Sequence, residues 1–366
     1  MSDRRLAAVS AACLLAWFST TATAAPRYRL TALDGGTAAT SAARGISADG
    51  KVTGSIGEAP SLAGFVYEGG QLQVFPSSGG QSYGADINSR GQVAGAYVDG
   101  SSFEAGQPAR FEQGQPQTLG TYGWASAINE RGQVAGTLSG QPGSHHRAFV
   151  HDEQGMRMLG VLGEAPDPYY TTSEARDLND NGQVVGLSST TSGDNHAFLY
   201  ENGSMRDLGT LGGRWSVADG ISNNGRITGS AALADDSYHA FLSDGGALHD
   251  LGTLGGGYSW GEAVNARGQV VGWSDVYNEN LDRAFLFDDG QMVDLNSLLD
   301  ATGRGWTLTA AYDINDRGQI VGTGLFNGSQ HAFLLTPVPE PATIALSAAG
   351  LGLLALRRRT RRPATA

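Results

Sequence analysis

Asp313-Ile314-Asn315-Asp316-Arg317-Gly318-Gln319-Ile320-Val321-Gly322 is one of seven copies of a single pattern in this chain. The other copies occupy residues 45–54, 86–95, 127–136, 177–186, 220–229 and 263–272. Each copy reads as an apolar residue, Asn or Ser, two polar residues, Gly and a β-branched pair, which is typical of a hairpin whose Gly is left-handed. The turn glycines, from Gly50 to Gly318, are 41, 41, 50, 43, 43 and 50 residues apart. A period of about 40 to 50 residues indicates a propeller or a solenoid.

A second unit alternates with these hairpins. It is clearest in residues 196–208, His-Ala-Phe-Leu-Tyr-Glu-Asn-Gly-Ser-Met-Arg-Asp-Leu, where two strands flank a Gly turn. Related copies begin near Ala63, Ala109, Ala148, Ala240, Ala284 and Ala332. Four strands per period is the content of one propeller blade. The chain here resembles the family of extracellular proteins with HAF repeats, named for the triplet that begins at His196, His239 and His331. That resemblance implies a repeat fold and no particular activity.

Two features predict that the array closes into a ring. Three residues before the apolar turn residue, every copy carries Ala or Gly: Ala43, Gly84, Ala125, Ala175, Ala218, Gly261 and Ala311. Small residues suit a crowded strand, so we expect this strand to be innermost. The chain opens with an outer-type strand at residues 27–33 and closes with a third-position strand at 331–336. Together they should complete one blade and remove an exposed sheet edge. We therefore expect an all-β, seven-bladed β-propeller of four-stranded blades over residues 25–337.

Composition limits the chemistry. The chain has 54 Gly among 366 residues and 16% charged residues, which suits short strands joined by turns. Cys13 is the single cysteine, so we expect neither disulfides nor thiolate metal sites. The formal charge of −12 argues against a broad basic surface for nucleic acid. Residues 177–182 begin like a calcium loop, but Ser188 stands at the twelfth position where Glu would be needed. An Asn turn is the favoured interpretation, and we expect no metal and no cofactor.

The N-terminus is typical of a secretory signal peptide. Arg4 and Arg5 precede the apolar run 6–18, and Ala22-Thr23-Ala24 supplies the small residues that a signal peptidase reads. We expect residues 1–24 to be removed on export.

The C-terminus carries a different signal. Pro339-Glu340-Pro341 leads into the apolar run 342–356, which Arg357, Arg358 and Arg359 follow. This order resembles the PEP-CTERM signal of exported Gram-negative proteins, over residues 338–366. The resemblance implies an exosortase as processing partner, removal of a short helix and delivery to the cell surface or an exopolysaccharide matrix. The run of 15 residues would rise only about 22 Å as a helix, short of the roughly 30 Å hydrocarbon layer. A transient inner-membrane anchor is therefore favoured over a permanent span.

Aromatic residues gather just before the inner strand, beside the longer connections, which should share one face of the ring. The candidate carbohydrate-binding residues are Tyr83, Trp124, Tyr170, Trp215, Trp260 and Trp306. Flat apolar rings with polar edges suit the faces of sugars, and loop tips on a rigid scaffold are common functional positions. The alternative is that these rings pack between blades.

No catalytic constellation is recognisable. Ser82 and Ser259 match a nucleophile-elbow pattern, but Ser41, Ser173 and Ser216 fill the same repeat position, and a nucleophile would occur once. We expect a secreted, non-catalytic surface or matrix protein with a polysaccharide or surface protein as partner. The alternative is a secreted carbohydrate-active hydrolase or lyase with acidic residues on the loop-bearing face. Two carboxyl groups that converge in one cleft with raised pKa would favour that alternative.

Overall fold

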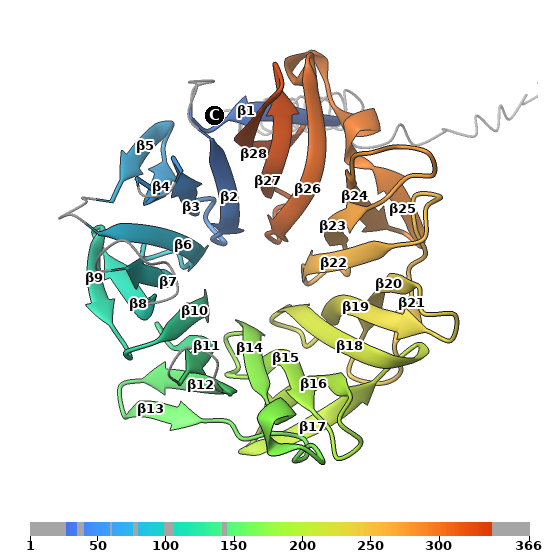
Figure 1. Ribbon diagram of the computed structural model, residues 1–366. Coiled ribbons are helices and arrows are strands. Elements are labelled where there is room, and N and C mark those ends of the chain that lie inside the picture. The colour runs from blue at the N-terminus through green and yellow to red at the C-terminus, as the bar shows by residue number, and fades with distance from the viewer. Residues whose placement is uncertain are drawn as a thin grey trace, which may run out of the picture.

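The computed structural model describes residues 27–34, 40–58, 61–75, 80–98, 106–140 and 145–338. Over these residues the chain forms seven four-stranded antiparallel sheets, arranged as blades around a central axis (Figure 1). The prediction of an all-β, seven-bladed propeller is confirmed. The signal peptide, the helix expected at 342–356 and the sorting residues 339–341 and 357–359 lie outside the described residues. No helix within the described ranges is long and apolar enough to cross a membrane.

Each blade follows the chain from the axis outward. The first three blades are β2 (Ser41–Ile46), β3 (Val52–Ile56), β4 (Ala63–Glu68), β5 (Gln71–Val74); β6 (Gln81–Ile87), β7 (Val93–Val98), β8 (Gln107–Glu112), β9 (Gln115–Thr118); and β10 (Gly123–Ile128), β11 (Val134–Ser139), β12 (His146–Asp152), β13 (Gly155–Met158). The next three are β14 (Ser173–Leu178), β15 (Val184–Ser189), β16 (Asn195–Glu201), β17 (Ser204–Gly209); β18 (Gly212–Ile221), β19 (Ile227–Leu233), β20 (Tyr238–Ser243), β21 (His249–Asp250); and β22 (Ser259–Val264), β23 (Val270–Ser274), β24 (Arg283–Asp288), β25 (Gln291–Asp294). Short 3-10 turns, η2 (Pro168–Tyr170), η3 (Leu295–Leu298) and η4 (Ala301–Gly303), lie in the connections.

The seventh blade joins the two ends of the described chain. It consists of β26 (Trp306–Ile314), β27 (Ile320–Phe326), β28 (Ser329–Val338) and β1 (Arg27–Ala32), in that order from the axis. β1 pairs antiparallel with β28, with Arg27 opposite Val338 and Ala32 opposite Phe333. The predicted closure by the N-terminal strand is confirmed. It gives the seventh blade four strands, as in the other six, and covers the outer edge of β28.

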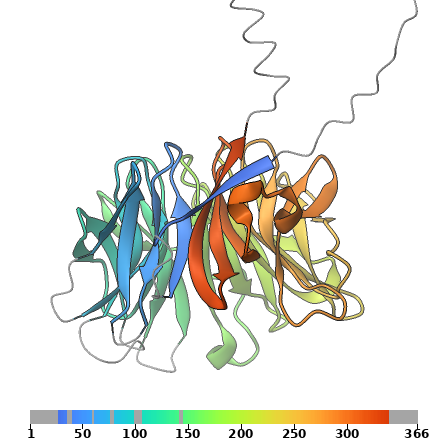
Figure 2. The ribbon, with the colours of Figure 1, turned by 90° about the horizontal axis from the view of Figure 1, so that it is seen from above.

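The strand directions divide the ring into two faces. The tight turns between first and second strands form one face, here called the tight-turn face. Connections between second and third strands, and those between blades, form the opposite loop-bearing face. β1 begins and β28 ends on the tight-turn face (Figure 2). The two ends of the described chain are therefore directed away from the loop-bearing face.

The small residues of the inner strands are confirmed as innermost, but the reason for their size differs from the expected crowding at the axis. A Cβ placed on Gly84 would lie 2.2 Å from Oγ1 of Thr53, in the second strand of the preceding blade. At Gly261 the same contact, to Thr228, would be 2.3 Å. The collision is thus with the neighbouring blade. Immediately after each small residue the strand register shifts by one residue.

The Ala-Phe strands supply the core. Their phenylalanines are at most 1% exposed in every blade: Phe65, Phe111, Phe149, Phe198, Phe241, Phe285 and Phe333. Fully burying such a ring stabilises the fold by roughly 1.5–3 kcal/mol. The repeated Phe therefore explains why a chain without disulfides in its described part can hold seven separate sheets together.

The turn of the repeat links successive blades. The side-chain oxygen of Asn179 accepts hydrogen bonds from the backbone N–H groups of Asn181 and Gln183 at 3.0 and 3.1 Å, which confirms the Asn turn predicted for residues 177–182. The side-chain oxygen of Asn88 accepts the same bonds from Arg90 and Gln92 at 3.1 Å each. Its Nδ2 donates to the carbonyl of Asn129 in the next blade, also at 3.1 Å. The same bond between blades recurs from Asn129, Asn179, Asn265 and Asn315.

Two blades have Ser in place of this Asn, and each uses another donor. In the blade of Ser47, Nζ of Lys51 reaches the carbonyl of Ser89 at 3.0 Å. In the blade of Ser222, Nδ2 of Asn224 reaches the carbonyl of Ala266 at 2.8 Å. Every turn of the described ring is therefore bonded to the next one.

The other recurring polar residues are also structural. The repeat serines each accept a hydrogen bond of 2.8–3.0 Å from a backbone N–H in the third strand of the preceding blade; they are Ser41, Ser82, Ser173, Ser216 and Ser259. The histidines of the HAF triplets pair with aspartates of their own blades: His196 with Asp207, His239 with Asp250 and His331 with Asp34. These hydrogen bonds and ion pairs give the repeated serines and histidines a structural role, although serine and histidine are also common catalytic and metal-binding residues.

Candidate functional site

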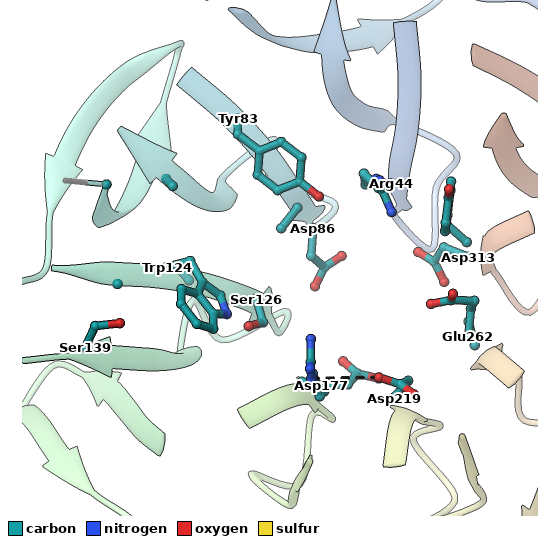
Figure 3. Close-up of a pocket in the computed structure, with 18 residues that line it drawn as sticks. Arg44, Tyr83, Asp86, Trp124, Ser126, Ser139, Asp177, Asp219, Glu262 and Asp313 are labelled. Carbon is teal, nitrogen blue, oxygen red and sulfur yellow. Dashed lines mark ion pairs between the residues drawn. The ribbon is translucent and has the colours of Figure 1, made fainter. Parts of the chain in front are cut away.

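A cavity of about 650 Å³ occupies the axis of the ring. Its wall includes the residue that follows the small residue in every inner strand: Arg44, Ala85, Ser126, Arg176, Asp219, Glu262 and Tyr312. The register shift at this point turns these side chains toward the axis. Figure 3 shows Arg44, Asp219 and Glu262 directed into the centre from different blades. Gly106 and Ser139, from the second-to-third connection of one blade and the end of β11, also line the cavity, so it reaches the loop-bearing face.

Three aspartates line the cavity at its end toward the tight-turn face. Oδ2 of Asp86, Asp177 and Asp313 each accepts a hydrogen bond of 2.7–2.8 Å from the backbone of the following blade. Oδ1 of each accepts from the next residue of its own strand at 2.7 Å. Burial raises the pKa of Asp177 to about 7 and that of Asp313 to about 6. Burial and the charges of Asp313 and Asp177 raise the pKa of Asp86 well above its ordinary value. Because both oxygens hold backbone N–H groups, these residues act as latches between blades.

Asp219 and Glu262 lie on adjacent inner strands at the wall of the same cavity. Nε1 of Trp260 donates to Oδ2 of Asp219 at 2.7 Å, and Nε1 of Trp273 donates to Oε1 of Glu262 at 3.1 Å. Arg176 lies between two carboxylates, 3.0 Å from Glu174 and 3.9 Å from Asp219. The hydrolase or lyase alternative requires carboxyl groups that share one cleft. Two such groups, Asp219 and Glu262, line the axial cavity and not the loops of the loop-bearing face.

A second hollow opens on the loop-bearing face between the fifth and sixth blades. This aromatic cleft, of about 470 Å³, is lined by Trp215, Tyr238, Tyr258, Ser259, Trp260, Trp273, Asp275 and Asp282. Its five rings form a continuous series. Tyr258 stacks on Tyr238 with centroids 6.2 Å apart. Tyr238 meets the edge of Trp215 at 5.5 Å.

The series continues inward through the tryptophans. Trp215 lies 5.4 Å from Trp260, and Trp260 stacks on Trp273 at 5.9 Å with an interplanar angle of 8°. Tyr258 remains 50% exposed at the outer end. The cleft thus brings five aromatic rings together, in two stacked pairs joined through Trp215, with polar atoms at its rim.

The two carboxyl groups of the cleft differ in their surroundings. Asp275 accepts backbone hydrogen bonds from Gly257 and Tyr258 at 3.0 and 2.8 Å, so both of its oxygens shape the loop before β22. Asp282 is exposed, and partial burial together with the charge of Asp275 raises its pKa. Asp282 is therefore the cleft carboxyl group available to a ligand.

The candidate aromatic residues do not form one site. Trp215 and Trp260 share the aromatic cleft, whereas Tyr83 and Trp124 line the axial cavity. Tyr170 is 62% exposed on η2. Trp306 stacks on Phe326 and meets the edge of His331, within the seventh blade.

Sequence reasoning missed Tyr238 and Trp273 of the cleft because neither precedes an inner strand. A signal was nevertheless present for Trp273. The residue after the final Gly of the repeat is Ser, Ala, Thr or Leu in the other copies, and Trp only here. The residues that line both hollows include positions at which one copy differs from the other copies of the repeat, and this difference is a better signal than residue type alone.

Comparisons with known proteins identify the C-terminal signal. Residues 337–362 match the PEP-CTERM protein-sorting motif. The motif marks a protein that is exported, processed by an exosortase and sorted to the cell surface of a Gram-negative bacterium. No curated protein matches the chain. The resemblance to HAF-repeat proteins stays a prediction.

Several solved structures are similar to the chain. One is TolB from Acinetobacter baumannii, with a TM-score of 0.45, 14% identity, and coverage of 80% of this chain and 65% of that one, slightly under two thirds. Another is a putative TolB from Agrobacterium tumefaciens, with a TM-score of 0.45, 13% identity and coverage of 74% and 95%. A third is a puromycin-hydrolyzing peptidase of Mycobacterium tuberculosis, with a TM-score of 0.46, 13% identity and coverage of 81% and 50%.

Proposed function

We propose that the protein is a surface-displayed, carbohydrate-binding propeller whose ligand site is the aromatic cleft. In this proposal residues 1–24 direct export, and Pro339-Glu340-Pro341 with Arg357, Arg358 and Arg359 directs sorting. The observation that carries the binding role is the series of five rings from Tyr258 to Trp273 in one cleft. Aromatic faces supply apolar area of fixed orientation, which complements the C–H faces of a sugar ring.

The polar groups of the cleft suit the same ligand. Asp282 lies at the rim as an acceptor for hydroxyl groups. Pockets of about 300–1,000 Å³ with apolar walls and few polar groups are typical small-ligand sites. A volume of about 470 Å³ suits a short stretch of glycan with the rest of the polymer outside.

The position of the cleft on the ring supports display. The described chain ends at Val338 on the tight-turn face, and the sorting motif begins at residue 337. The cleft opens on the opposite, loop-bearing face. A membrane or matrix attachment through the C-terminal segment therefore leaves the cleft free to meet polymer.

The alternative hydrolase or lyase would need a carboxyl pair on the loop-bearing face. In the cleft, Asp275 is engaged by two backbone N–H groups, which leaves Asp282 without a matched partner for acid–base work. The cleft geometry therefore favours binding over catalysis at this location.

A glycan array with the purified full chain tests the proposal. We expect retention on a defined set of glycans by the wild type, and loss of that retention in Trp215→Ala. Trp215 is suited to this test because its side chain makes ring contacts but no hydrogen bond to a buried carboxyl group. Equal retention by the wild type and Trp215→Ala would place the ligand elsewhere, and no retention would remove the carbohydrate role.

A further inference from the structure

In each inner strand, the residue after the small residue faces the axis, and its type varies from blade to blade. Along each inner strand the flanking positions recur: Ser two residues before the small residue in five blades, and Ile, Leu or Val three residues after it in all seven. The residue that faces the axis is instead Arg, Ala, Ser, Arg, Asp, Glu and Tyr in turn. A position with a structural task would recur as the turn Asn and the buried Phe do. The variety of residue types at the axis indicates that these side chains contact a ligand and do not hold the blades together.

The neighbours of Asp219 and Glu262 hold the two carboxyl groups in different states. Burial raises the pKa of Asp219 to about 6, and Arg176 and the Trp260 N–H oppose that rise. Burial, followed by the charge of Asp219, raises the pKa of Glu262 to about 8, against the opposing effect of Arg44. At neutral pH Asp219 is therefore mainly ionised and Glu262 mainly protonated. A pair whose surroundings separate the two pKa values is the arrangement that acid–base catalysis requires.

The cavity also offers hydrogen-bond donors that the protein leaves unused. Nε of Arg44 and Nε of Arg176 are buried without a hydrogen bond to any part of the chain that the structure describes, although Nε of Arg176 lies 3.9 Å from Oδ1 of Asp219. Arg44 is held in place by Tyr312, whose ring centroid lies 3.9 Å from the guanidinium carbon. Buried donors without acceptors are costly unless a ligand or water satisfies them. Sugar hydroxyl groups are acceptors of the required kind.

The wall of the cavity carries ionisable groups of both signs. Arg44 and Arg176 stand there with five carboxyl groups, those of Asp86, Asp177, Asp219, Glu262 and Asp313. Of these five groups, three accept hydrogen bonds from the backbone with both oxygens, and Glu262 is mainly protonated at neutral pH. A volume of about 650 Å³ is within the range of pockets for ligands of one or a few rings. A neutral glycoside satisfies the size, the polarity and the hydrogen-bonding pattern together.

We propose that the axial cavity is a glycoside-hydrolysing site, in which Glu262 acts as the general acid and Asp219 as the general base. Glu262 gives its proton to the glycosidic oxygen as the bond from that oxygen to the anomeric carbon breaks, and the bonding pair leaves with the oxygen. Asp219 takes a proton from a water molecule whose oxygen bonds to the anomeric carbon. Two hydroxyl compounds result, and proton exchange with solvent returns both carboxyl groups to their starting states.

The roles of the flanking residues follow from their contacts. Trp260 and Trp273 are positioning residues, because each indole N–H donates a hydrogen bond to one oxygen of a catalytic carboxyl group. Arg176 keeps Asp219 the more acidic of the two. This activity is separate from binding in the aromatic cleft, since no described residue lines both the cleft and the cavity.

Hydrolysis is tested with the full chain and a panel of α- and β-linked di- and trisaccharides of glucose, galactose, mannose, xylose and N-acetylglucosamine. New reducing ends are measured by chromatography. We expect cleavage of at least one linkage by the wild type. Glu262→Gln and Asp219→Asn should each lower the rate about 100-fold or more. Glu153→Gln, at an exposed carboxyl group in the turn between β12 and β13, should leave the rate unchanged.

The two amide variants keep an oxygen acceptor for Trp273 and Trp260, so each is expected to fold, which circular dichroism checks. No cleavage of any panel sugar by the folded wild type would overturn the proposal. Cleavage that Glu262→Gln and Asp219→Asn leave unchanged would overturn it equally. Loss of array binding by Trp215→Ala with unchanged hydrolysis would keep the axial site and the cleft as separate functions.

Discussion

Nε1 of Trp260 donates a 2.7 Å hydrogen bond to Oδ2 of Asp219, and this bond connects a residue of the aromatic cleft with a residue of the axial cavity. Trp260 lines the cleft, and Asp219 lines the cavity. A similar bond joins Trp273 to Glu262 at 3.1 Å. Both hollows thus take lining residues from the same inner strand, β22.

This bond makes Trp260 a residue of both structure and site. Trp260→Phe keeps most of the ring but leaves the carboxylate of Asp219 without its donor, so we expect the free energy of unfolding to fall by about 1–3 kcal/mol. Trp260→Ala, which also removes the packing, should cost about 3–5 kcal/mol. Urea unfolding followed by circular dichroism measures both. Equal stability of Trp260→Phe and the wild type would show that the bond contributes nothing.

The aspartate latches give a second prediction. In Asp177→Asn the amide offers only one acceptor to the backbone N–H groups of Leu178 and Ile221, and its NH₂ faces a donor. We expect a loss of about 1–3 kcal/mol in the free energy of unfolding. The matched control Asp289→Asn, in an exposed turn with φ 48°, should change it by less than about 0.5 kcal/mol. A loss of similar size in both variants would contradict the latch.

Stability should depend on pH through the axial carboxyl groups. Burial raises their pKa values to about 6 for Asp313 and Asp219, about 7 for Asp177 and about 8 for Glu262. The folded state then binds protons more tightly than the unfolded chain, in which these groups titrate near pH 4. Their contribution is full below about pH 4 and is lost as the pH rises through 6 to 8. Thermal unfolding should therefore show a lower Tm at pH 8 than at pH 5.5, and a Tm that rises over this interval would count against the buried carboxyl groups as described.

Sorting gives a prediction outside the described residues. Because residues 337–362 match the sorting motif, we expect an exosortase to remove the apolar tail. Mass spectrometry of surface-exposed protein from a host with an exosortase should then detect no peptide from Ala342 onward. The same host without its exosortase is the control and should retain these peptides. Intact tails in the first host would contradict processing.

The fold could be read from the sequence to an unusual extent because its elements repeat. Seven copies of one hairpin and one Ala-Phe unit define the blades, and the unmatched strands at residues 27–33 and 331–336 indicate the closure that β1 and β28 make. The reason for the small residues could not be read, since a repeat shows that Gly84 must be small but not that Thr53 of another blade is what it would strike.

The sites were harder to predict from the sequence, because their residues do not repeat from copy to copy. Asp219 and Glu262 lie 43 residues apart in the chain and line one cavity only because the ring places successive inner strands side by side. Residue type alone also misled, since Trp306 joins the packing of its own blade while Trp215 lines a cleft. A comparison of each copy with its repeat would have singled out Trp273 and the axial residues.

The most direct test of the binding role is isothermal titration calorimetry with the glycan that the array selects. We predict that Tyr258→Ala, which removes the exposed outer ring of the cleft, weakens affinity about tenfold or more, or ~1.4 kcal/mol, with little change in Tm. Tyr170→Ala is the matched control, because Tyr170 is also exposed but lies on η2, in the connection between the third and fourth blades. The affinity of this variant should equal that of the wild type. Unchanged affinity in Tyr258→Ala, or an equal loss in Tyr170→Ala, would contradict the assignment of the aromatic cleft as the carbohydrate site.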